Sequence, residues 1–190
     1  RVPGKFSQSL KLAPGASVVI SGNDLSFNQS FSFSLWAKIL DDAEGTILSN
    51  GQLRLEYRDD LKLYGSIYTE NGWEEVSSFA KQGKWTHYAL SLTNSQLMMF
   101  INGNQVSSSN LTTSMSWEDL DDRDLYLGSP EAINWSMGGN VLLDELRIYD
   151  RALSESEISS LYGYGSGDLG IRPQIYGDSP FSISPPPQSI

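Results

Sequence analysis

Two adjacent acidic residues, Asp144 and Glu145, interrupt the apolar segment VLLDELRIYD at residues 141–150. Regular alternation along a strand would place Asp144 on the same face as the apolar side chains of this segment, the face expected to point inward. A carboxylate on such a face needs hydrogen-bond donors or a cation. We therefore expect Asp144 to bind a cation, to accept hydrogen bonds from loop amides, or to pair with Arg147 or Arg151.

A second group of acidic side chains lies in the segment WEDLDDRD, residues 117–124, the densest acidic cluster of the chain. This segment lacks the D-x-D-x-D-G spacing of a dedicated calcium loop. A solvated loop face is therefore favoured over a calcium-binding rim.

Aromatic side chains in polar, turn-rich segments offer a different chemistry. Sugar rings stack on flat aromatic surfaces, while neighbouring amides and carboxylates bind the hydroxyl groups. Trp135, beside Asn134, is the residue on which we place most weight. The alternative for each tryptophan is that it plugs an end of the fold. The predicted ligand-binding residues are Trp135, Asn134, Trp117, Trp73 and Tyr68.

The composition restricts the possible partners of the protein. The chain has 190 residues, of which 39% are hydrophobic, enough for one globular core. With 13 basic and 23 acidic residues, its net charge of −10 argues against nucleic acid and favours a cation or a neutral ligand. Cysteine is absent and His87 is the single histidine, which excludes thiol catalysis and multi-histidine zinc sites. Apolar runs are too short for membrane insertion.

Short strands must position these residues. Residues 31–39 alternate between apolar and mostly polar side chains, as in a half-buried strand. Several turn pairs then separate further apolar segments, which is typical of hairpins in series. Short strands without long helices between them predict an all-β, antiparallel two-sheet sandwich. The turn pairs are Asn50-Gly51, Asp59-Asp60, Asn71-Gly72 and Asn102-Gly103.

One short helix is expected after the last strand. Ser154 and Glu157 have the spacing of a capping box, in which each side chain binds a backbone amide of the other residue. Ile158 and Leu161 would face the core, and Gly163 would end the helix after about two turns. So short a helix must be stabilised by packing on the sandwich.

The composition changes after the helix. Residues 165–190 are rich in Gly, Ser and Pro, which predicts an extension or linker to a following module, and within it the segment IRPQIY can add a peripheral strand. The globular domain is accordingly predicted to span residues 1–164. The chain starts without Met and is interpreted as a segment of a longer protein.

Four segments occur in an order that resembles a known family: FSFSLWAKI, GKWTHYALSLTNSQLMMFINGNQV, LYLGS and LLDELRIYDRALSESEI. Together they span most of residues 6–162 and resemble the laminin G-like domains of the concanavalin A-like lectin/glucanase superfamily. The resemblance implies a jelly roll of two antiparallel sheets, with ligands on the concave face or at the loop rim. Tyr57, Tyr64 and Tyr68 would then line the concave sheet.

The resemblance also implies a structural Ca²⁺ near Asp144, because the matching acidic position often lies beside one in related domains. This chain departs from the pattern, since it has APGASVV where relatives often carry several acidic residues. Asn23 and Asp24 are the replacements expected here. The predicted metal ligands are thus Asp144, Asn23 and Asp24, with amide capping by Asp144 as the alternative.

Catalysis is not expected. Glucanases of this architecture use two carboxylates that flank the glycosidic bond, usually on a Glu-x-Asp-x-(x)-Glu strand. The chain lacks that motif, and His87 lies in KWTHYAL at a position that is commonly a packing residue in the resembled family. No catalytic residue is predicted.

We therefore interpret the sequence as a non-catalytic module of an extracellular or cell-surface multidomain protein. It would bind carbohydrate, as a lectin does, or another surface ligand in cell adhesion. The alternatives are a protein–protein adhesion or spacer domain and a degenerate glycoside hydrolase or lyase.

Overall fold

In the computed structural model, the chain is described at residues 2–6, 8–22, 30–41, 44–111, 123–128, 140–166 and 181–182. These residues form short strands and one helix, as the sequence predicts. None of the helices in these residues is long and apolar enough to span a membrane. The elements are β1 (Val2–Pro3), β2 (Gln8–Leu12), β3 (Ser17–Ile20), β4 (Phe31–Ile39), β5 (Gly45–Ser49), β6 (Leu53–Tyr57), β7 (Lys62–Thr69), β8 (Gly72–Phe79), β9 (Thr86–Leu92), β10 (Gln96–Ile101), β11 (Asn104–Asn110), β12 (Leu125–Gly128), β13 (Val141–Tyr149), α1 (Glu155–Ser166) and β14 (Phe181–Ser182).

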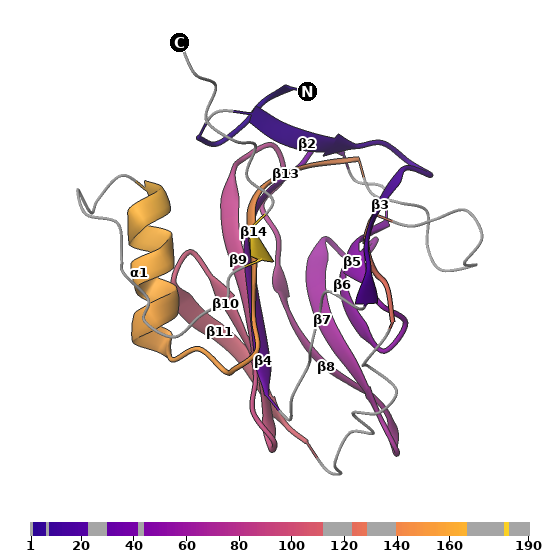
Figure 1. The fold of residues 1–190 in the computed structure, drawn as a ribbon, viewed down its shortest axis with the longest axis vertical. Helices are drawn as coiled ribbons and strands as arrows, with labels where there is room; N and C mark the ends of the chain where they lie inside the picture. The colour runs from indigo at the N-terminus through magenta and orange to yellow at the C-terminus, as the bar shows by residue number, and fades with distance from the viewer. Residues whose placement is uncertain are drawn as a thin grey trace.

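The strands form two antiparallel sheets that are stacked as two layers (Figure 1). The eight-stranded sheet has the order β1-β2-β13-β4-β9-β10-β11, and β14 pairs with β13. The six-stranded sheet has the order β3-β12-β5-β6-β7-β8. The predicted two-sheet jelly roll is therefore confirmed. The short β14 comes from the predicted linker, whereas the segment IRPQIY lies outside the described residues.

The predicted turn pairs join successive strands. Asn102 and Gly103 have φ angles of 51° and 80°, the left-handed pair that a type I′ hairpin requires between β10 and β11. Asn50 joins β5 and β6 and accepts a hydrogen bond from the amide of Leu53 at 2.8 Å. Between β7 and β8 the turn lies one residue earlier than predicted, because Gly72 already pairs with Thr69.

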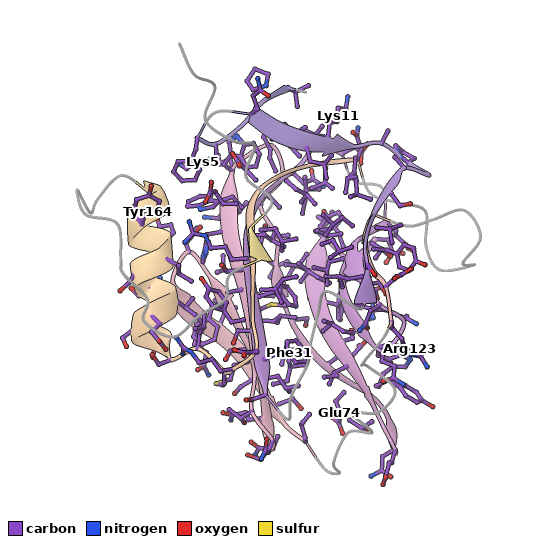
Figure 2. All side chains as sticks on the ribbon, viewed as in Figure 1. Lys5, Lys11, Phe31, Glu74, Arg123 and Tyr164 are labelled. Atoms are coloured by element: carbon purple, nitrogen blue, oxygen red, sulfur yellow. The ribbon has the colours of Figure 1, made fainter. Side chains whose placement is uncertain are left out.

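The main core fills the space between the two sheets, as the side chains in Figure 2 show. Phe31, Phe33 and Leu35 of β4 point into it and are each at most 2% exposed. Opposite them, a Cβ added to Gly65 of β7 would lie 2.5 Å from Leu90 of β9. Glycine at this position therefore allows the two sheets to approach closely.

The prediction that β4 is half-buried is wrong, because its second face is covered as well. The turn before α1 folds over this face, where the Leu153 amide donates to Ser32 Oγ at 2.8 Å. Ser91 Oγ in turn donates to the Leu153 carbonyl at 2.9 Å. Ser32 and Ser91 point away from the main core, yet both are buried. Their hydrogen bonds to the turn offset the cost of burying the two hydroxyl groups.

Helix α1 packs on the sandwich, as expected, and covers the outer face of the eight-stranded sheet (Figure 1). Ile158 and Leu161 are buried as predicted, and they pack in a second apolar cluster with Phe100 of β10 and Tyr149 of β13. The helix continues past Gly163 to Ser166 and is longer than predicted. Tertiary packing of its apolar face outweighs the low helix propensity of glycine.

The capping box is confirmed. Glu157 Oε2 accepts hydrogen bonds from the backbone amide of Ser154 at 2.8 Å and from its hydroxyl at 2.7 Å. Glu157 Oε1 also forms an ion pair with Arg151 at 2.7 Å. The helix start is therefore held by side chains that lie within one turn of it.

A β-bulge in β13 changes which way its acidic residues point. Glu145 has φ 51°, and the register to β4 shifts between Asp144 and Arg147. Asp144 pairs with Trp36 on the outer side, whereas Leu146 belongs to the core between the sheets. Regular alternation was the wrong assumption here, because one extra residue reverses the phase of the strand.

Candidate functional site

The predicted site residues divide into two groups. Tyr68, Trp73 and Asp144 belong to the described part of the chain. The other five predicted residues lie outside it, so the structure places neither the tryptophan–asparagine pair nor the proposed calcium loop. These five are Trp135, Asn134, Trp117, Asn23 and Asp24.

Tyr68 and Trp73 lie side by side on the outer face of the six-stranded sheet. They are register partners on β7 and β8, and their ring centroids are 5.3 Å apart in an edge-to-face arrangement of 67°. Tyr68 is 46% exposed and Trp73 is 36% exposed, although both are large aromatic residues. The guanidinium of Arg54, on β6, lies 3.9 Å from the centroid of the Trp73 ring. Cation–π contact of this kind holds the indole ring in place.

Charged side chains continue this surface. Arg58 binds Glu75 Oε1 at 2.5 Å and Glu56 Oε1 at 2.6 Å, and its guanidinium lies 3.8 Å over the Tyr64 ring. Ser66 Oγ also donates to Glu75 Oε1 at 3.0 Å. The hydrogen bonds from Arg58 lower the pKa of Glu75, so that carboxylate remains ionised.

Tyr64 lies on the same outward face of β7 as Tyr68 and has its own acidic partner. The hydroxyl of Tyr64 donates to Asp60 Oδ2 at 2.7 Å, and Lys62 Nζ lies 3.2 Å from the same oxygen. The hydrogen bond to Asp60 raises the pKa of Tyr64. We call the following set the β6–β8 surface: Arg54, Glu56, Arg58, Tyr64, Ser66, Tyr68, Trp73 and Glu75.

Sequence reasoning identified the two exposed aromatics but not the charged residues around them. The alternation in LRLEYR places Arg54, Glu56 and Arg58 on one face, and this pattern is the signal that could have identified them. The expectation for Tyr57 is wrong. Its ring lies in the core at 2% exposure, and its hydroxyl accepts a hydrogen bond from Gln82 Nε2 at 2.7 Å.

Asp144 accepts hydrogen bonds from two backbone amides, one before β2 and one within β13. Its Oδ2 atom accepts from the amide of Phe6 at 3.1 Å, and its Oδ1 atom accepts from the amide of Glu145 at 2.9 Å. Burial raises the pKa of this carboxyl, and the Phe6 amide opposes the shift. In the described residues, three or more His, Cys, Asp or Glu side chains do not gather in a metal-binding arrangement. The calcium site stays a prediction because its other two residues lie outside that part of the chain.

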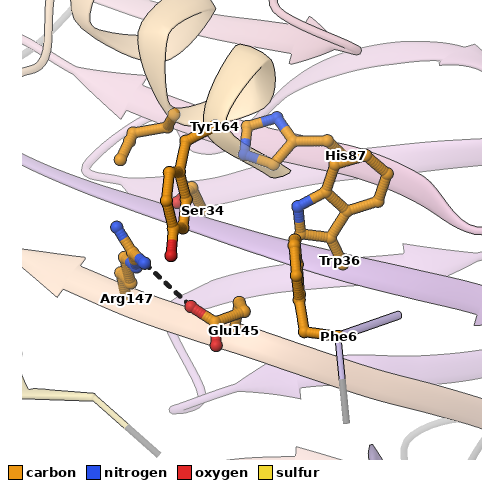
Figure 3. A pocket seen from close by; sticks show the side chains of 8 residues that line it. Phe6, Ser34, Trp36, His87, Glu145, Arg147 and Tyr164 are labelled. Atoms are coloured by element: carbon orange, nitrogen blue, oxygen red, sulfur yellow. Dashed lines mark hydrogen bonds and ion pairs between the residues drawn. The ribbon is translucent and has the colours of Figure 1, made fainter. Parts of the chain in front are cut away.

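A small cavity lies under the N-terminal end of the chain, on the outer face of the eight-stranded sheet (Figure 3). Its volume is about 10 Å³, which is close to the space that one water molecule requires. Glu145 and Arg147 form an ion pair at 2.8 Å on one side of the cavity. The cavity is lined by Phe6, Ser34, Trp36, His87, Glu145, Arg147, Leu161 and Tyr164.

His87 is a packing residue in this region. It is 2% exposed, and its ring lies 5.5 Å from the Trp36 ring and 6.1 Å from the Tyr162 ring. Burial and the charge of Arg147 lower the pKa of His87 to about 3. The imidazole is therefore neutral at physiological pH and is enclosed by aromatic rings.

Solved structures share this fold. The binding domain of Paraclostridial Mosquitocidal Protein 1 has a TM-score of 0.69 and 18% identity, over 86% of this chain and 45% of that chain. The binding domain of botulinum neurotoxin DC, solved in complex with SialylT, has a TM-score of 0.63 and 15% identity. Botulinum neurotoxin type C, whose cell entry depends on interaction with two ganglioside molecules, has a TM-score of 0.62 and 15% identity. Each of these two matches covers 78% of this chain and 40% of the neurotoxin chain.

The chain therefore spans less than half the length of these structures, and at these identities the likeness shows the fold alone. None of the curated proteins matches the chain significantly. The family described as the concanavalin A-like lectin/glucanases superfamily matches residues 13–159, which include most strands of both sheets and the start of α1. The chain belongs to this superfamily, in its laminin G-like branch.

Proposed function

We propose that this chain is a non-catalytic binding module that holds carbohydrate on the β6–β8 surface. The observation that carries the proposal is the exposed pair of Tyr68 and Trp73, with the paired Arg58 and Glu75 beside it. Aromatic rings exposed on a rigid sheet are already ordered, so binding does not have to immobilise them.

The chemistry of the surface suits a sugar. The apolar faces of a pyranose ring pack on aromatic side chains, and its hydroxyl groups both donate and accept hydrogen bonds. Glu75 supplies a carboxylate that accepts, and Arg58 supplies guanidinium groups that donate. A sugar hydroxyl can add a hydrogen bond to this ion pair as donor or as acceptor, which a purely apolar ligand cannot do.

The comparisons support a binding module without naming its ligand. The neurotoxin domains that share the fold are binding domains, one solved with SialylT and one that interacts with gangliosides. Carbohydrate at a cell surface is therefore a reasonable ligand class for this chain, and we propose an extracellular or cell-surface setting within a longer protein. The same setting accommodates a role in adhesion.

The carboxylates of the β6–β8 surface do not suit glycoside hydrolysis. A general acid at neutral pH needs a raised pKa, whereas Arg58 lowers the pKa of Glu75. Glu56 is bound by the same guanidinium. Both groups are occupied by an ion pair, which favours a binding role.

A glycan array probed with the full chain tests this function. We expect saturable binding to at least one glycan, and Trp73→Ala should abolish it. The matched control is Phe6→Ala, which removes an aromatic of similar exposure, 43%, that packs against Trp36 of the eight-stranded sheet. Binding to no glycan at all, or equal binding by Trp73→Ala and the unmodified chain, would overturn the proposal.

A further inference from the structure

A third exposed aromatic lies on the same face as Tyr68 and Trp73, at the other end of β8. Phe79 is 70% exposed, the highest value among the large apolar residues that are described as exposed. Val76 points into the core, so Trp73, Glu75 and Phe79 share the outward face of the strand. Lys62, the register partner of Phe79, lies 5.5 Å from the centroid of its ring.

We propose that the β6–β8 surface, together with Phe79 at its end, takes an extended, neutral polysaccharide chain that lies along β7 and β8 from Trp73 to Phe79. This proposal rests on the proposed function and names its ligand class. It differs from recognition of one terminal sugar, which would need a single aromatic platform.

The length of the surface supports an extended ligand. Phe79 lies six positions after Trp73 on an uninterrupted strand, a span of roughly 20 Å at the rise of a β-strand. One or two sugar rings do not cover this distance, whereas a polysaccharide segment does. Because an exposed phenylalanine costs free energy in water, a ligand that covers both Trp73 and Phe79 gains at both ends.

The middle of the surface supplies the polar groups that such a chain needs. Between the two aromatics lie Ser66, Glu75 and Tyr64, and the first two already share a hydrogen bond of 3.0 Å. Arg58 contacts both Glu75 and the Tyr64 ring, so its donors lie in the same region. Donors and acceptors therefore lie together between the two aromatics, and sugar hydroxyl groups can bind to both kinds of group.

The charge of the surface favours a neutral ligand over a polyanion. Arg58 is neutralised by Glu56 and Glu75, and Lys62 is paired with Asp60. A sulfated or carboxylated polysaccharide would have to compete with these carboxylates for the same cations. It would also approach a chain whose net charge is −10.

The test compares short and long ligands by titration calorimetry. The probes are the disaccharides and hexasaccharides of cellulose, xylan, mannan and laminarin, with a heparin hexasaccharide as the polyanion. We expect at least one neutral hexasaccharide to bind about tenfold more tightly than its disaccharide. Phe79→Ala should remove this advantage and leave the disaccharide affinity unchanged, since that ligand stays at Trp73.

Leu61→Ala is the matched control. Leu61 is 47% exposed and its carbonyl accepts the Ala80 amide, so it is an apolar neighbour of Phe79 in the turn before β7. This variant should retain the full hexasaccharide affinity.

The outcomes separate the two proposals. Equal affinity for disaccharide and hexasaccharide, an unaffected Phe79→Ala variant, or tightest binding to heparin would overturn the extended neutral ligand while carbohydrate binding stands. The extended neutral ligand would also be overturned if the chain bound glycans on the array but none of the oligosaccharides of these neutral series. Absence of binding to any glycan overturns both.

Discussion

The backbone amide of Phe6 donates a hydrogen bond of 3.1 Å to the carboxylate of Asp144, 138 positions later in the chain. Gly4 packs against the same carboxylate, because a Cβ atom added to Gly4 would lie only 2.6 Å from Asp144 Oδ2. One buried carboxylate thus fixes the N-terminal segment to the bulge of β13. The acidic pair that interrupts an apolar strand therefore has a structural role in joining these two segments.

Asp144→Ala should lower the free energy of unfolding by about 1–3 kcal/mol, because it leaves the amides of Phe6 and Glu145 without their acceptor. Urea denaturation measures the change. The control is Asp150→Ala, which removes an exposed carboxylate shortly after the same strand and should change stability by less than about 0.5 kcal/mol. Equal losses in the two variants would contradict this role.

Calcium binding at Asp144 is a separate prediction. A ligand that binds only the folded protein raises the midpoint of thermal unfolding. We expect added Ca²⁺ to raise it and a chelator to reverse the effect if Asp144, Asn23 and Asp24 coordinate the ion. A melt that Ca²⁺ leaves unchanged would remove all three as ligands and leave amide capping as the function of Asp144.

Phe33→Ala should cost about 3–5 kcal/mol of stability, since this ring is 2% exposed in the core between the sheets. Phe79→Ala deletes the same side chain at 70% exposure and should change stability by less than about 0.5 kcal/mol. Chemical denaturation of both variants gives the comparison. A loss below about 1 kcal/mol for Phe33→Ala would mean that β4 faces the other way.

Burial of His87 makes the stability of the protein depend on pH below about pH 6.5. Its pKa is about 3 in the folded protein and near 6.5 in the unfolded chain, so the unfolded state binds the extra proton as the pH falls. The stabilisation is fully present above about pH 6.5 and is lost progressively as the pH falls toward 3.

Denaturation at about pH 7 and about pH 5 measures the effect, and we expect the protein to be less stable at the lower value. His87→Gln has no group that titrates at this position, so its stability should change less over the same interval. An unmodified chain with equal stability at both values would contradict a buried, neutral His87.

Ser154→Ala should destabilise the protein by about 1 kcal/mol, because the capping box loses the hydroxyl that binds Glu157. Thermal unfolding monitored by circular dichroism measures it. Ser159→Ala, which changes another exposed serine of α1 away from the cap, is the control and should have a smaller effect. A larger loss in the control would mean that Ser154 is not the cap.

Much of the fold was predictable because it depends on local signals. Asn102-Gly103 can adopt the two positive φ angles of a tight hairpin, and the spacing of Ser154 and Glu157 produces a capping box in almost any context. The order of amphipathic strands then predicted a sandwich and the correct superfamily. Trp73 was chosen because it follows a polar turn, and Tyr68 because the resemblance placed it on the concave sheet. Both side chains are exposed.

Other features depend on contacts between distant parts of the chain. The bulge at Glu145 turns Asp144 toward Phe6, and no local pattern marks where a strand gains an extra residue. The burial of Ser32 depends on a turn that lies 121 positions later. Alternation states which side chains share a face of a strand, but only the packing of the second layer or of α1 decides whether that face meets water.

The sequence by itself thus determined the strands, their turns, the capped helix and the class of fold, because each follows from neighbours within a few residues. Only the tertiary structure decided that Arg54, Arg58 and Glu75 join Tyr68 and Trp73 on one surface. That surface is assembled by the register of three strands, and register is set by how the whole sheet packs over its core.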